Sequence, residues 1–235
     1  MKIVSWNCGG SFRTKASQIA EHQPDIAIIQ ECECEKTIYS EKSFPKTLKV
    51  KRFGTFPSEY KGIGVMSCTG LNFELDNSYN PNIKHCIPLK VTGYVNFNLI
   101  AVWTIGHQDH KKSYIGQVYQ AINHYRDFIS SADTIIIGDF NSNQKWDKTR
   151  SVGNHTDVVN GLKQMGLVSL FHEINSIPHG SESVNTFFPN NKKQPHHIDY
   201  CFAPESWKDR VKKFDIGDHS EWAMSDHSPL FVEFE

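Results

Sequence analysis

The chain has 235 residues, of which 38% are hydrophobic and 12% aromatic, and its formal net charge is −1 at pH 7. This length is enough for one sizeable hydrophobic core, so we expect a single domain covering residues 1–235. The balanced charge excludes a general attraction to polyanions, so a nucleic acid would have to be held by a local basic patch.

Short apolar runs rich in β-branched and aromatic residues alternate with turn residues along the chain. This pattern predicts many short strands. In chain order, we expect them at residues 2–7, 25–31, 47–53, 62–68, 85–91, 96–104, 134–140, 197–203, 210–217 and 229–234.

Helical periodicity is less common and occurs in three places. Apolar residues three and four positions apart predict helices at 11–23, 113–130 and 156–166, the last capped by Thr156 or Asp157. The first two helices each lead into an apolar strand that ends in an acid. Two sheets packed face to face and covered outside by helices would bring both strand ends to one rim, where we expect a cleft.

The N-terminal residues and the cysteines bear on the location of the protein in the cell. The opening residues KIVSWN are typical of a strand, and nowhere do about 18 apolar residues follow one another. We therefore expect a cytoplasmic protein with no membrane partner, acting as a monomer. The six cysteines include members in apolar, strand-like runs, which favours reduced thiols. Cys32 and Cys34 lack a second Cys/His pair at finger spacing, which argues against structural zinc.

Polar side chains stand at or near the ends of several predicted strands. Carboxylate and amide oxygens are the ligands that Mg²⁺ or Mn²⁺ accepts, and this inventory fits phosphoryl chemistry. Singly, most of these residues could instead form turns, but a carboxylate between apolar neighbours, such as Asp199, is costly unless it is paired. The set is Asn7, Glu31, Asp139, Asn141, Asp199, Asp226 and His227.

Five short motifs contain these residues: SWN (5–7), QE (30–31), GDFN (138–141), HIDY (197–200) and SDH (225–227). In this order they resemble the endonuclease/exonuclease/phosphatase superfamily, which includes DNase I, exonuclease III and the tyrosyl-DNA phosphodiesterases. The resemblance covers residues 3–234. It implies an α+β fold, a four-layer αββα sandwich of two mostly antiparallel sheets flanked by helices.

The resemblance also implies a role for each polar residue. Glu31 would be the principal ligand of Mg²⁺ or Mn²⁺, with Asn7 and Asp226 completing or orienting the coordination sphere. Asp139 would face the attacking water, and Asn141 would donate a hydrogen bond to the phosphoryl group.

The last two motifs are expected to meet as a pair. Asp199 would hold the imidazole of His227 in one tautomer and favour its cationic form. His227 could then donate to a nonbridging phosphate oxygen or act as a general acid or base.

The sequence departs from the family pattern at two places. Many relatives have a Tyr or a Thr-His pair after the central strand, where this chain has Trp103 or Thr104. His107, His110 or Tyr114 could fold back to fill that role, and we take Trp103 and Tyr114 as candidate substrate contacts. His196 stands where DNA-repair members have a Trp, which puts abasic-site recognition in doubt and leaves His196 as a third candidate. His155 and His172 are expected to be core or loop residues.

We therefore expect a divalent-metal phosphohydrolase that uses in-line attack of water. The leading interpretation is a nuclease with DNA or RNA as its partner, with basic segments at 111–114, 191–197 or 208–213 as possible contacts. The alternative is a phosphatase or phosphodiesterase for a small nucleotide or phosphorylated metabolite. A degenerate binding module is a third hypothesis, disfavoured because the metal and dyad residues are all present.

Overall fold

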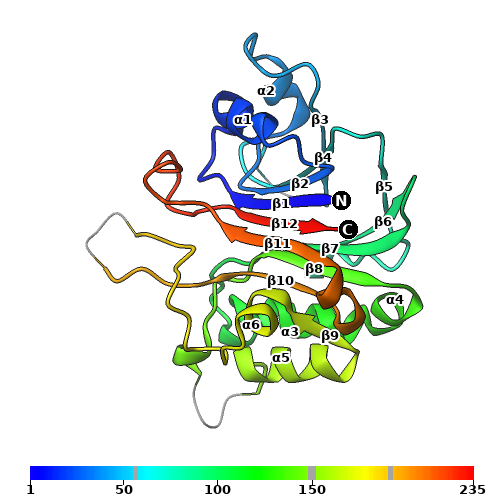
Figure 1. Cartoon of the computed structure of the whole chain (residues 1–235), viewed down its shortest axis with the longest axis vertical. Coiled ribbons are helices and arrows are strands. Elements are labelled where there is room, and N and C mark those ends of the chain that lie inside the picture. The colour runs from blue at the N-terminus through cyan, green and yellow to red at the C-terminus, as the bar shows by residue number, and fades with distance from the viewer. Residues whose placement is uncertain (55–57, 148–151, 190–192) are drawn as a thin grey trace.

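A computed structural model of the chain describes residues 1–54, 58–147, 152–189 and 193–235. Within these ranges the strands form two six-stranded sheets, which pack face to face and carry helices on their outer sides (Figure 1). This arrangement confirms the predicted four-layer sandwich.

The first sheet has the strand order β11-β12-β1-β2-β4-β3. Its one parallel pair in the described ranges is β1/β2, and its other neighbours are antiparallel. Two helices, α1 and α2, lie above it in Figure 1. The bounds are β1 Lys2–Asn7, α1 Phe12–Glu21, β2 Ile26–Gln30, α2 Glu35–Tyr39, β3 Lys49–Phe53, β4 Ile63–Ser67, β11 Val211–Ile216 and β12 Leu230–Phe234.

The second sheet has the order β5-β6-β7-β8-β10-β9, and its parallel pair within the described residues is β7/β8. Its outer side carries helices α3, α5 and α6, with α4 at one end (Figure 1). The bounds are β5 Asn72–Leu75, β6 Cys86–Thr92, β7 Phe97–Trp103, α3 Ile115–His124, α4 Arg126–Ser131, β8 Thr134–Asp139, α5 His155–Gln164, β9 Leu167–Ser169, α6 Leu170–Asn175 and β10 Asp199–Pro204.

The two parallel pairs explain the helix–strand repeat seen in the sequence. In each sheet a helical connection returns the chain to a strand parallel to the one it left, β1 to β2 and β7 to β8. Parallel strands end at the same edge, so Asn7 stands opposite Gln30 and Trp103 opposite Asp139. Because β1 and β2 also contact β8 across the sandwich, both edges contribute to one rim.

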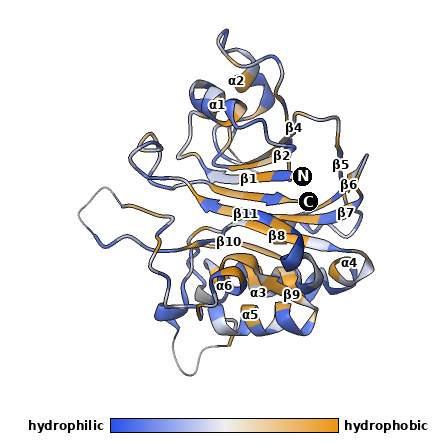
Figure 2. Cartoon of the chain, viewed as in Figure 1, coloured by the Kyte–Doolittle hydropathy of each residue, from blue (hydrophilic) through white to orange (hydrophobic). Residues whose placement is uncertain are grey.

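The core is divided between three layers. One apolar cluster fills the space between the two sheets. A second lies between the second sheet and its helices, and a third lies between the first sheet and its helices. Strand β10 serves two of them: Cys201 belongs to the inter-sheet core, whereas Tyr200 and Phe202 belong to the cluster under the helices. Burial on both faces accounts for the unbroken apolar runs in the central strands, which Figure 2 shows in orange.

Several elements differ from the expectations. The sequence reading missed β9, which has three residues, and β5, an edge strand without a fully buried residue. It also missed the short helices α2 and α6, and it joined α3 and α4, which separate at Tyr125. The cap of α5 is Asn154, which accepts from the Asp157 N–H, and not Thr156 or Asp157.

Two further expectations concern the whole chain. No helix in the described ranges combines the length and apolar character that crossing a bilayer requires. All six cysteines fall within those ranges and are free thiols.

Candidate active site

Four elements place the predicted polar residues at the shared rim. Asn7 ends β1, Asp139 ends β8, Asp199 begins β10, and His227 lies shortly before β12. Asp139 and Asp199 are direct partners in the antiparallel ladder, so their carboxylates lie on one face of the sheet. Like charges opposite each other are unfavourable, and a cation between them would relieve the repulsion.

His227 supplies that positive charge. Its Nδ1 lies 2.9 Å from Asp199 Oδ2, and its Nε2 lies 3.9 Å from Asp139 Oδ2, beyond hydrogen-bond range. One ligand-type atom from each of the three residues lies within 4.8 Å of the other two. The predicted pairing of Asp199 with His227 is therefore present in the structure.

The electrostatics of the three groups are linked. Burial acts to lower the pKa of His227, but the charges of Asp199 and Asp139 outweigh it and raise that pKa to about 9. Burial raises the pKa of Asp139 to about 7, with His227 opposing the rise and Asp199 adding to it. His227 is consequently an imidazolium at neutral pH, held in a site where it is only 4% exposed.

Asp139 is fixed by two amides. Its Oδ2 accepts from Asn7 Nδ2 at 3.0 Å and from Asn141 Nδ2 at 2.9 Å, and its Oδ1 accepts from the Asn141 N–H at 2.8 Å. Asn141 Nδ2 also donates to Thr104 O at 2.9 Å. Both amide hydrogens of Asn141 thus have partners inside the protein, and the predicted bond to a phosphoryl group would replace one of them.

One residue that links Asp199 to the segment of His227 was not predicted from the sequence. Thr186 Oγ1 accepts from the N–H groups of Ile198 and Asp199 at 3.0 and 3.1 Å, and its carbonyl accepts from Ser228 N at 2.8 Å. This buried threonine therefore joins the start of β10 to the segment that carries His227. It lies in a loop without a motif, so nothing in the local sequence indicated it.

Two of the three predicted metal ligands, Glu31 and Asp226, lie at the same rim and are less buried than Asn7. Glu31 directly follows β2 and forms a 2.6 Å ion pair with Lys61, a partner that the sequence did not indicate. Ser225 Oγ donates to Asn7 O at 2.7 Å, which brings the neighbouring Asp226 to the end of β1. Both carboxylates are partly exposed.

Three of the predicted site residues have a strained backbone conformation. Among the described residues, six non-glycine residues have positive φ, and three of them are predicted site residues: Glu31 at 57°, Asn141 at 47° and Tyr114 at 48°. Such conformations cost free energy and persist where surrounding structure enforces them, often at functional sites.

A groove of about 1030 Å³ adjoins the rim and includes Asn141 in its lining. Tyr114 and Trp146 also line it and are 47% and 48% exposed. His196 packs edge-on against Trp146, with ring centroids 4.8 Å apart. Of the three predicted substrate contacts, Tyr114 and His196 thus lie in or beside the groove, whereas Trp103 is 7% exposed and belongs to the inter-sheet core.

Comparison with known proteins gives a result at the level of structure. No protein-family model matches the sequence, and no curated protein sequence matches it. An AP endonuclease from Archaeoglobus fulgidus has a TM-score of 0.69 at 20% identity, over 100% of this chain and 99% of that one. The 3'-5' exonuclease NExo from Neisseria meningitidis has a TM-score of 0.69 at 20% identity, over 100% of both chains.

A third similar structure is the catalytic domain of Xenopus laevis APE2, with a TM-score of 0.71 at 15% identity, over 100% of this chain and 91% of that one. These proteins share the fold described above over 91% to 100% of their length, and the predicted resemblance is confirmed at the level of the fold. The chain has the fold of the endonuclease/exonuclease/phosphatase superfamily.

Proposed function

We propose that this protein is a divalent-metal-dependent phosphoesterase that hydrolyses phosphodiester bonds in DNA or RNA. The observation that carries the proposal is the buried Asp199–His227 pair, 2.9 Å apart, beside Asp139 at the rim of the sandwich. The activities of the similar structures, an AP endonuclease and a 3'-5' exonuclease among them, support the same class of reaction.

The residues of the rim divide the work of hydrolysis. Asp199 occupies Nδ1 of His227, which leaves Nε2–H to donate to a phosphate oxygen as negative charge develops there. Asp139 orients the attacking water and accepts its proton. Asn7 and Asn141 hold the Asp139 carboxylate in place, so their first role is to position it.

The donor set at the rim fits Mg²⁺ or Mn²⁺. The carboxylates of Glu31 and Asp226, with the amide oxygen of Asn7, are the hard oxygen ligands that these ions prefer. The Lys61 ammonium lies 2.6 Å from Glu31 Oε2, which supports a position for positive charge beside this carboxylate. When bound, the ion would offset negative charge on the phosphate and on the leaving oxygen.

The groove beside Asn141 supports a nucleic acid substrate. Tyr114 and Trp146 present half-exposed aromatic rings on which unpaired bases can stack, and Lys111 contributes a positive charge to the lining. The balanced net charge of the chain makes such local contacts the main source of affinity. Part of the basic segment 191–197 lies outside the described residues.

A second candidate function has some support from the same groove. Its volume of about 1030 Å³ is close to the upper end for small-molecule sites, roughly 300–1,000 Å³. A small nucleotide or phosphorylated metabolite would therefore fit as the substrate of a phosphatase or phosphodiesterase. Loss of affinity with rising salt separates the two, because a polymer makes several phosphate contacts and a small substrate makes few.

The decisive experiment is a hydrolysis assay with Mg²⁺ or Mn²⁺, with and without chelator. The substrates are single- and double-stranded DNA, RNA, an abasic duplex and a panel of small phosphoesters. We expect chelator-sensitive cleavage of at least one nucleic acid, lost in Asp199→Asn and retained in His124→Gln, which removes an exposed histidine outside the rim. Turnover of small phosphoesters alone would favour the second candidate, and no turnover of any substrate would refute both.

A cytoplasmic location also remains our proposal. Its support is the presence of six free thiols, a state that a reducing compartment maintains.

A further inference from the structure

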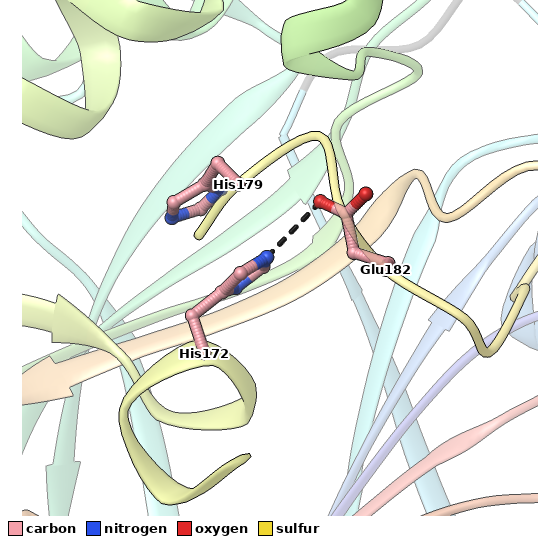
Figure 3. A group of neighbouring side chains, drawn as sticks. All are labelled: His172, His179 and Glu182. Carbon is pink, nitrogen blue, oxygen red and sulfur yellow. Dashed lines mark hydrogen bonds and ion pairs between the residues drawn. The ribbon is translucent and has the colours of Figure 1, made fainter. Parts of the chain in front are cut away.

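A second group of metal-ligating side chains lies on the outer side of the second sheet. His172 belongs to α6, and His179 and Glu182 belong to the segment that follows this helix (Figure 3). One ligand atom from each residue lies within 4.8 Å of the other two. His172 and Glu182 are buried, whereas His179 is partly exposed.

The group is separate from the catalytic rim. It packs near Tyr200, whose ring centroid lies 5.8 Å from that of His179 and 6.0 Å from that of His172. Tyr200 faces the helices, whereas the preceding residue, Asp199, reaches His227 at the rim. Strand β10 therefore stands between the two groups.

Each of the three side chains is oriented by further hydrogen bonds. Glu182 accepts from Gly180 N at 2.8 Å and from Asn143 Nδ2 at 3.1 Å. The Nδ1 of His172 lies 2.8 Å from Ser169 Oγ. The Nδ1 of His179 lies 3.1 Å from His155 Nε2. Outer partners of this kind fix the ring orientation of histidine ligands in metal sites.

A neighbouring histidine has a buried nitrogen without a hydrogen-bond partner among the described residues, which is an independent indication of a ligand site here. His197 is 2% exposed, and its ring centroid lies 5.8 Å from that of His172. Its Nδ1 is bonded to Val184 O, but its Nε2 is buried with no hydrogen-bond partner among the described residues. A buried polar atom without a partner is unfavourable, and native proteins hold few of them.

We propose that His172, His179 and Glu182 bind a transition-metal ion of the zinc type. Two imidazole nitrogens and one carboxylate form a ligand set that Zn²⁺ takes, with a fourth position left for water, whereas Mg²⁺ and Ca²⁺ prefer oxygen alone. The contact between His172 Nε2 and Glu182 Oε1, at 3.0 Å, is close to the roughly 3.3 Å that separates two ligands of tetrahedral zinc.

Binding requires loss of the proton that lies between His172 Nε2 and Glu182, and one local movement. The rings of His172 and His179 are stacked, with centroids 3.6 Å apart and planes 14° from parallel (Figure 3). The nitrogen lone pairs of stacked rings lie in parallel planes and cannot converge on one ion. The His179 ring must therefore turn toward the space beside His172 Nε2 and Glu182. His179 lies in a loop and is partly exposed, so it can turn without repacking the core.

The site would stabilise the segment that holds the catalytic dyad. Glu182 lies four positions before Thr186, which binds the backbone N–H of Asp199 and joins it to the segment of His227. An ion that joins α6 to Glu182 would restrain this segment from its N-terminal side. The group lies apart from the rim, so the ion would raise stability without taking part in hydrolysis there.

The test uses the full chain, stripped of metal by a chelator and titrated with Zn²⁺ in a calorimeter and with Co²⁺ in a spectrophotometer. Because the rim could also take these ions, all proteins carry Glu31→Gln and Asp226→Asn. We expect one bound ion, the intense visible bands of four-coordinate cobalt, and a higher melting temperature with Zn²⁺. Adding His179→Gln should weaken binding at least about a hundredfold and remove the melting shift, whereas adding His124→Gln should change neither.

Two further measurements keep the result clear. Circular dichroism of the His179→Gln protein should match that of its parent, since the residue is partly exposed. His179→Gln introduced alone should leave hydrolysis at the rim unchanged. Equal Zn²⁺ affinity with and without His179→Gln, or no Zn²⁺ binding once Glu31 and Asp226 are replaced, would overturn the proposal while leaving the proposed hydrolase function untouched.

Discussion

The rim and the outer histidine group contain the same chemical pair in opposite surroundings. His227 and Asp199 lie 2.9 Å apart at the rim, and His172 and Glu182 lie 3.0 Å apart under the helices. At the rim one imidazole faces two carboxylates, which raise the pKa of His227 to about 9. Around Glu182 several imidazoles share one carboxylate, and burial lowers the pKa of His155 and of His197 to about 4.

The balance between burial and neighbouring charge therefore decides what a buried imidazole can do. An imidazole surrounded by carboxylates keeps its proton and can donate it to a phosphate oxygen. Where burial outweighs the neighbouring carboxylates, as at His155 and His197, the imidazole stays neutral and retains a lone pair, which is the form that binds a metal. Distance alone does not separate a proton donor from a metal ligand, whereas burial together with neighbouring charge does.

The largest expected effect is on catalysis at the rim. His227→Gln should lower the rate of nucleic acid hydrolysis by about a thousandfold, because it removes the donor to the phosphate and leaves Asp199 unpaired. The measurement is the initial rate under saturating Mg²⁺, with circular dichroism to confirm folding.

The matched control for this variant is His179→Gln, a histidine from the other group. It should retain the wild-type rate. Equal losses in the two variants would contradict the division of the molecule into a catalytic and a non-catalytic group.

The second prediction contrasts the pH dependence of stability in chelator-treated protein. His197 titrates near 4 when folded and near 6.5 when unfolded, so the unfolded state binds more protons between these values. Stability should therefore fall on acidification from about pH 6.5 to 4 by up to about 3 kcal/mol per such histidine. His227 has the opposite sign: its contribution is complete below 6.5 and is lost as pH rises through about 9.

Urea unfolding across this pH range checks both signs. His197→Gln should flatten the acid limb of the stability curve, and His227→Gln should flatten the alkaline limb. A curve in which both variants change the same limb would show that the two groups share one electrostatic environment.

The sequence predicted the rim because its residues follow the rules of strand ends. Asp199 stood between apolar neighbours and so required a partner, and the helix–strand repeat placed Glu31 and Asp139 at one edge. Regular strands fix where these side chains lie, so short motifs in the right order were sufficient to predict them.

The outer group could not be predicted in the same way. Its ligands at 172, 179 and 182 follow no fixed spacing, and they meet only because α6, a helix of six residues, turns the chain back. Lys61 and Thr186 are similar cases, since each reaches the rim from a loop. Contacts made by loops depend on tertiary packing, which local patterns do not encode.

The smallest expected effect concerns the loop after β8, which serves both groups. It carries Asn141, bonded to Asp139 at the rim, Asn143, bonded to Glu182, and then Trp146 in the groove.

Trp146→Ala should raise KM for single-stranded DNA about tenfold, the value of one lost stacking contact, and leave kcat unchanged. The matched control is Tyr94→Ala, an aromatic residue with 62% exposure that does not line this groove. A fall in kcat instead of a rise in KM would mean that the loop transmits strain to Asp139, and the two groups would then be coupled through it.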